Sequence, residues 1–215
     1  AAEHRKGRGL YIGTTDLDQM RGRIWDIGAI AASGAPGAKE LVHKIMLASA
    51  SIPAVFPPVR IQVEAEGGRY DELHVDGGTA AQVFVYPATT NWPDLLDLLE
   101  VPGKPNIYVI RNAPLKPEPA EVEPKLIPIA GRAISSLIRT QGIGDLYLIY
   151  MLSVRDDANY RLAYIPEDFD EESTEPFDTV YMNKLFDLGF RLGRDGYQWA
   201  DAPPGWRRGA IDAER

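Results

Sequence analysis

The stretch His74-Val75-Asp76-Gly77-Gly78 marks the end of a strand and is the most informative point of this 215-residue chain. The pattern over 70–75 predicts a strand, and the paired glycines after it allow positive φ angles and a sharp turn. The absence of side chains beside Asp76 leaves its carboxylate accessible at a strand end, which is where open α/β sheets place their sites. An aspartate next to glycines is also the commonest kind of turn, and spacing alone favours that plain turn.

A second strand precedes this stretch. The run over 59–64 is joined to the strand over 70–75 by Ala65-Glu66-Gly67-Gly68. The glycines allow a tight reversal, so the two runs predict a hairpin. Further upstream, the runs 9–15 and 23–27 predict two more strands, which form either a hairpin or consecutive strands of one sheet.

Helices and strands alternate through the rest of the chain. We expect helices over 38–51, 91–100 and 177–192, strands over 106–111 and 160–165, and a strand or strand-like turn over 82–86. Over 127–153 we expect two helices or one kinked helix, interrupted at Gly142-Ile143-Gly144. Prolines predict an exposed loop over 113–125. The alternation predicts an α/β or mixed three-layer domain over 1–194, followed by a loosely ordered tail over 195–215.

Composition excludes several classes of protein. Lysine and arginine number 23 against 31 acidic residues, and the net charge of -8 opposes binding of nucleic acid. The chain has no cysteine, which excludes disulfides, thiolate catalysis and cysteine-ligated metals. Its histidines lack zinc-binding spacing, and Asp16, Asp18 and Asp26 lack the pattern of an EF-hand loop, so they are interpreted as solvated turn carboxylates. We expect no metal and no cofactor, and no apolar run approaches the ~20 residues that span a bilayer.

Three ordered motifs resemble the patatin-like phospholipase family. They are Gly13-Thr14-Thr15-Asp16-Leu17-Asp18 leading to Ile24-Trp25-Asp26-Ile27-Gly28-Ala29-Ile30-Ala31, then Ala48-Ser49-Ala50-Ser51-Ile52-Pro53-Ala54-Val55-Phe56-Pro57-Pro58, then Val75-Asp76-Gly77-Gly78. The resemblance covers roughly Gly9 to Pro87. It implies a three-layer α/β/α fold, of which this chain is the C-terminal portion.

The resemblance also implies an activity. Patatin-like enzymes are serine acyl hydrolases that cleave carboxylic esters of phospholipids, lysophospholipids and related lipids with a Ser–Asp dyad. Asp76 matches the family's catalytic aspartate, and Gly77 and Gly78 match the turn of its motif. The family works without a histidine, so His74, which shares a strand face with Asp76, is expected to pack or hydrogen-bond near the site.

The sequence departs from the family at the nucleophile. Neither the G-x-S-x-G elbow nor the glycine-rich oxyanion loop occurs in the 215 residues. Ser33, Ser49 and Ser51 lack an elbow context and are expected to bond locally at turns and helix ends. We therefore expect a half-domain that is inactive alone and that associates with a missing N-terminal half or with its own copies. The alternative is a non-catalytic binding or assembly domain with a patatin-like shell.

The expected partner is a lipid or acyl-ester substrate, which is compatible with peripheral contact with a membrane. Arg5, Lys6 and Arg8 form a small basic cluster, which we interpret as a solvated helix end rather than a lipid site. Localisation is not predicted, because any export signal would precede Ala1.

Overall fold

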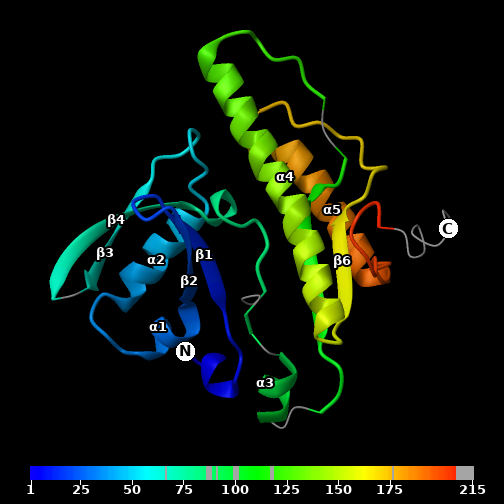
Figure 1. Cartoon of the computed structure of the whole chain (residues 1–215). Helices are drawn as coiled ribbons and strands as arrows, with labels where there is room; N and C mark the ends of the chain where they lie inside the picture. The colour runs from blue at the N-terminus through cyan, green and yellow to red at the C-terminus, as the bar shows by residue number, and fades with distance from the viewer. Residues whose placement is uncertain are drawn as a thin grey trace, which may run out of the picture. The chain divides into compact units, whose positions relative to one another are not determined.

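The computed structural model describes residues 1–65, 67–85, 89–90, 92–98, 102–116, 119–175 and 177–206. Its contacts divide the chain into two compact units. Unit 1 comprises Ala1–Phe84 and Val122–Asp145, and unit 2 comprises Val85–Glu121 and Leu146–Arg215. Both units combine helices with strands, which confirms the α/β class (Figure 1).

A four-stranded antiparallel sheet forms the centre of unit 1. Its order is β2-β1-β4-β3, with β1 at Tyr11–Asp16, β2 at Arg21–Asp26, β3 at Val59–Ala65 and β4 at Gly68–Asp76. β1 pairs with β2 as a hairpin, which decides between the two arrangements expected for them, and β3 pairs with β4 as predicted. β1 and β4 pair from Thr14 opposite Asp76 to Asp16 opposite His74, so the end of β4 lies beside the middle of β1.

Helix α2, Ala38–Ser49, packs its apolar stripe on this sheet (Figure 1). Ile45 and Ala48 of α2 are buried in one cluster with Ile61 of β3 and with Ile27. Ile27 begins α1, Ile27–Ala32, a short helix that the sequence did not predict. The Asp26 carboxylate caps this helix by accepting a hydrogen bond from the Ala29 N–H at 2.8 Å.

Two short 3-10 helices complete the regular structure near this sheet, η1 at His4–Lys6 and η2 at Gly77–Thr79. Of the strand or strand-like turn expected over 82–86, the strand is excluded for residues 82–85, and Tyr86 lies outside the described residues. The N–H groups of Gln82 and Val83 donate to the carboxylate of Asp145, at 2.8 and 3.2 Å, so they are not available for strand pairing.

Unit 2 is built on two parallel strands, β5 at Asn106–Pro114 and β6 at Asn159–Ile165. Its helices are α3, Trp92–Leu98, and α5, Thr179–Asp195, together with the last part of α4, Leu126–Arg155. α4 is one continuous helix, so of the two arrangements expected around Gly142-Ile143-Gly144 the one with two separate helices is excluded. None of the helices in the described part of the chain is both long enough and apolar enough to span a bilayer.

The proline-rich loop and the C-terminal tail agree with the prediction only in part. Residues 115–116 and 119–125 form neither helix nor strand, as expected for the proline-rich loop, whereas Ala113 and Pro114 extend β5. Where a loosely ordered tail is expected, Ala200 pairs with Leu162 of β6. The Tyr197 hydroxyl also bonds the backbone N–H and C=O of Tyr164, both at 3.1 Å. The described part of the tail is thus attached to β6.

Candidate functional site

Asp76 lies where β4 ends and η2 begins, and its backbone is fixed on both sides. Its N–H donates to the Ser51 carbonyl at 2.9 Å, and its carbonyl accepts a hydrogen bond from the Thr15 hydroxyl at 3.0 Å. The carboxylate accepts a hydrogen bond from the Gly78 N–H at 2.7 Å. The side chain itself is half-buried. The structure therefore holds the carboxyl group in one place while leaving part of its surface accessible.

Both glycines after Asp76 lie too close to neighbouring atoms for a side chain to fit. A Cβ atom at Gly77 would lie 2.5 Å from the carbonyl oxygen of Gly13, and one at Gly78 would lie 2.8 Å from the Asp76 carboxylate. Neither glycine has a positive φ angle, so the turn does not use the backbone freedom that the paired glycines allow. What the motif requires is the absence of side chains, which lets β4 turn against the backbone of β1.

Burial raises the pKa of the Asp76 carboxyl above its ordinary value of 3.8, and the hydrogen bond from the Gly78 N–H offsets part of that rise. Desolvation disfavours the charged form of an acid, whereas a donor aimed at the carboxylate favours it. A carboxylate with a raised pKa is a stronger base once it has lost its proton. Asp76 is therefore suited to accept a proton from a hydroxyl group placed beside it.

The three serines considered as nucleophiles all use their hydroxyl groups locally. Ser33 donates to the Ile30 carbonyl at 2.8 Å, and Ser49 donates to the Met46 carbonyl at 2.9 Å. The Ser51 hydroxyl, which is buried, donates to the Leu47 carbonyl at 2.8 Å. These contacts agree with the expected turn and helix-end roles, and none of the three sits on a strand-to-helix elbow.

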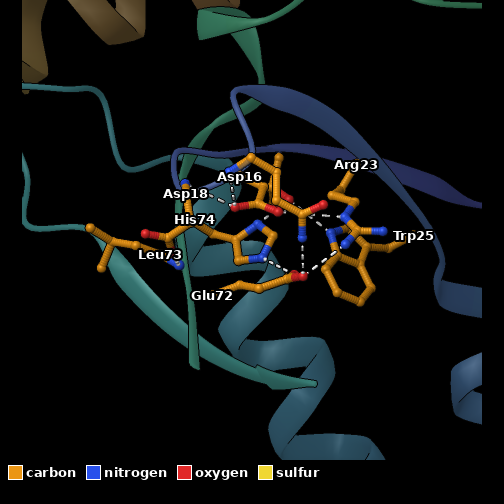
Figure 2. Close-up of polar contacts among 9 residues, drawn as sticks. Asp16, Asp18, Arg23, Trp25, Glu72, Leu73 and His74 are labelled. Carbon is orange, nitrogen blue, oxygen red and sulfur yellow. Dashed lines mark hydrogen bonds and ion pairs between the residues drawn. The ribbon is translucent and has the colours of Figure 1, made fainter. Parts of the chain in front are cut away.

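His74 is completely buried and lies in a polar network within unit 1 (Figure 2). Its Nδ1 is 3.0 Å from the Thr14 hydroxyl, and its Nε2 is 3.1 Å from the Glu72 carboxylate. The Trp25 ring meets the imidazole edge-on, with centroids 5.6 Å apart, and the indole N–H donates to Thr14 at 2.8 Å. Both ring nitrogens of His74 are thus occupied by groups other than Asp76.

Glu72 extends this network toward β2. Its second carboxylate oxygen accepts hydrogen bonds from Gln19 at 2.8 Å and from Arg23 at 2.7 Å (Figure 2). Asp16 is also fully buried and accepts backbone hydrogen bonds from Asp18 and Gln19. Its other oxygen lies 3.8 Å from Arg23 Nε. The interpretation of Asp16 as a solvated turn carboxylate is therefore wrong.

Of this network, only His74 was expected from the sequence to lie near a site. Thr14 lies in the first of the three motifs, and Glu72 alternates with His74 along β4, so a period of two places Glu72 and His74 on one face. This alternation of Glu72 and His74 along β4 could have indicated from the sequence that the two side chains lie together. Among the described residues, no group of three or more histidine, cysteine, aspartate or glutamate side chains is arranged to hold a metal ion.

Residues 13–89 match the family model described as Patatin-like phospholipase. The matched segment runs from β1 through η2 and includes Asp76 with both glycines. The match confirms the resemblance and relates this segment to a family of lipid acyl hydrolases. Neither a curated protein nor a solved structure matches the chain.

Proposed function

We propose that this chain carries the catalytic aspartate of a patatin-like serine acyl hydrolase, with Asp76 as the base of a Ser–Asp dyad. The observation that carries the proposal is the position of Asp76-Gly77-Gly78 at the end of β4, within the segment that matches the family. The fixed backbone and half-buried carboxyl of Asp76 support this role, because a general base must be held within hydrogen-bond reach of the proton that it takes.

In this mechanism the serine nucleophile lies outside the 215 residues. As its hydroxyl oxygen attacks the ester carbonyl, Asp76 takes the hydroxyl proton. The tetrahedral intermediate then expels the alcohol, which receives that proton, and an acyl-enzyme remains. Water attacks the acyl-enzyme and gives a proton to Asp76. The bond between the acyl carbon and the serine oxygen then breaks, the serine oxygen takes that proton from Asp76, and the carboxylic acid leaves. The donors that stabilise the oxyanion also come from outside this chain.

The raised pKa of Asp76 gives the proposed reaction a pH dependence. Asp76 acts as a base only when it has lost its proton, so the rate rises with pH as the carboxyl ionises. Because burial raises this pKa, the increase in rate occurs at a higher pH than it would with an ordinary carboxyl group. The proposed substrates are carboxylic esters of phospholipids, lysophospholipids or related lipids.

A second candidate function is a non-catalytic binding or assembly domain that keeps the patatin-like shell. The observation that favours it is the lack of a G-x-S-x-G motif in the sequence. The two candidates differ in one respect that can be measured, since only a serine hydrolase reacts covalently with a fluorophosphonate.

The experiment is fluorophosphonate labelling of the full-length protein, followed by peptide mapping, with the 215-residue chain labelled in parallel. The hydrolase proposal predicts one labelled serine outside these residues and no label on the chain alone. Label on a serine within Ala1–Arg215 would contradict the dyad as proposed. No label on the full-length protein would favour the binding domain.

A further inference from the structure

Three segments that are far apart in the sequence meet at the backbone of Asp76. The Thr15 hydroxyl of β1 donates a hydrogen bond to the Asp76 carbonyl at 3.0 Å, across 61 residues of sequence. The Ser51 carbonyl, just after α2, accepts a hydrogen bond from the Asp76 N–H at 2.9 Å. Thr15 and Ser51 are both buried, and each belongs to a different one of the three motifs that resemble the family. The three motifs therefore meet at one residue.

Thr15 makes a contact that no other side chain of the described residues makes, a hydrogen bond to the Asp76 backbone. It lies on the strand face opposite to Thr14, because neighbouring residues of a strand alternate between faces. The Thr14 hydroxyl contacts His74 and Trp25, and Thr15 does not take part in that network. A substitution of Thr15 therefore alters the support of Asp76 and leaves the bonds of the buried network in place.

The hydrogen bond from Thr15 fixes the direction of the peptide group that follows Asp76. Peptide groups are planar, so a carbonyl that is held by a donor fixes the orientation of the whole group. The same hydroxyl lies 3.5 Å from the Gly77 carbonyl oxygen, which also accepts two N–H groups of the turn, at 3.0 and 2.9 Å. The N–H of this second peptide group belongs to Gly78 and donates to Oδ1 of Asp76 at 2.7 Å. The bonds around Thr15 thus determine where the Gly78 N–H points.

The two oxygens of the Asp76 carboxylate differ in their contacts. Oδ1 accepts the Gly78 N–H, whereas no described residue donates a hydrogen bond to Oδ2. Both oxygens of an ionised carboxylate are acceptors, so Oδ2 keeps its capacity to accept a proton. Because the Gly78 N–H holds Oδ1, it also sets the direction in which Oδ2 lies.

We propose that Thr15 is a positioning residue for the proposed Ser–Asp dyad, with its hydroxyl holding the Asp76 backbone so that Oδ2 takes the proton of the serine. This inference rests on the proposed function, since Thr15 acts on the reaction only through Asp76. The Thr15 hydroxyl keeps its own proton throughout. A displacement of about 1 Å from the productive geometry lowers an enzyme's rate by about 100-fold, so the loss of this hydrogen bond should be visible in kcat.

The test measures kcat and KM of the full-length protein with a p-nitrophenyl ester for Thr15→Val and Thr15→Ser, with folding checked by circular dichroism. Valine keeps the shape of threonine and removes the hydroxyl, whereas serine keeps the hydroxyl and removes the methyl group. We expect kcat to fall about tenfold or more in Thr15→Val, with KM within about twofold of the parent, and to stay within about threefold in Thr15→Ser. A packing role for Thr15 predicts the opposite order of the two variants.

Thr79→Val is the matched control, because Thr79 lies in η2, close to Asp76 in sequence, and its hydroxyl has no hydrogen-bond partner among the described residues. We expect its kcat to stay within about twofold of the parent. The inference is overturned if Thr15→Val keeps the parent kcat, if Thr15→Ser loses as much as Thr15→Val, or if Thr79→Val does. Should Thr15→Val not fold, Thr15→Ser decides alone: a kcat near the parent supports the inference, and a tenfold loss overturns it.

Asp76→Asn in the same assay separates this inference from the proposed function. If Asp76→Asn lowers kcat and Thr15→Val does not, the role of Thr15 is wrong and the dyad stands. If Asp76→Asn keeps the parent kcat, the proposed function is wrong and the role of Thr15 fails with it.

Discussion

The sheets of the two units are held together by different kinds of contact. In unit 1, polar side chains of β1 and β4 are buried and bonded to one another, with His74 between Thr14 and Glu72. In unit 2, the buried residues of the two strands are mostly apolar, among them Val109 and Leu162. Directional bonds specify one arrangement of their partners, whereas apolar contact is non-directional.

The network in unit 1 also lies next to the proposed catalytic residue. Thr14, which contacts His74 through its hydroxyl, is the Cα partner of Asp76 across β1 and β4. The segment that matches the family, 13–89, contains every residue of this network. The comparison indicates that directional hydrogen bonds fix side-chain positions in unit 1, next to Asp76. The following variants test this difference between the units.

Glu72→Ala should have the largest effect on stability. It removes the group that bonds His74, Gln19 and Arg23, and it leaves a buried polar network without its central acceptor. Breaking a buried ion pair costs about 3–5 kcal/mol of the free energy of unfolding, which urea denaturation measures. Glu64→Ala is the control, because Glu64 pairs with Arg69 at the surface and should cost about 0–1 kcal/mol. Equal losses of unfolding free energy in Glu72→Ala and Glu64→Ala would contradict the claim that the buried polar network stabilises unit 1.

A pair of leucine substitutions sharpens the description of unit 2. Leu162→Ala removes a completely buried side chain from β6, and truncation of a buried leucine costs about 2–5 kcal/mol. Leu188→Ala truncates a side chain of α5 that is already partly exposed, so little new cavity is created and we expect a loss of about 1 kcal/mol. If Leu188→Ala destabilises the protein as much as Leu162→Ala, α5 is packed more tightly than the structure shows.

Local patterns predicted the elements that depend on nearby residues. The glycines between 65 and 68 predicted the hairpin of β3 and β4, and the helical spacing of Leu41, Ile45 and Ala48 predicted α2. The chain does not divide into two helices at Gly142-Ile143-Gly144, because a glycine in a helix costs only about 1 kcal/mol, which packing of neighbours such as Leu146 can offset. Helix α1 was missed because six residues are too few to show a period.

The buried network could not be predicted from local patterns. Asp16 lies in a polar segment that predicts a solvated turn, and its burial depends on partners brought from other parts of the chain. Arg23 comes from β2 and Glu72 from β4, 49 residues apart in sequence. Pairing between strands places them together, and no spacing within one segment encodes that contact. The position of Asp76 at a strand end, by contrast, followed directly from the glycines beside it.

The most direct test of the central proposal is the turnover number of the full-length protein with a p-nitrophenyl ester, measured for Asp76→Asn and Asp71→Asn. Asp71 lies on the same strand but is exposed, so its substitution is a matched control. If Asp76 is the base, Asp76→Asn should lower kcat by about 10²–10⁴-fold while Asp71→Asn leaves it unchanged. A folded Asp76→Asn variant that hydrolyses the ester at the parent rate would contradict the assignment.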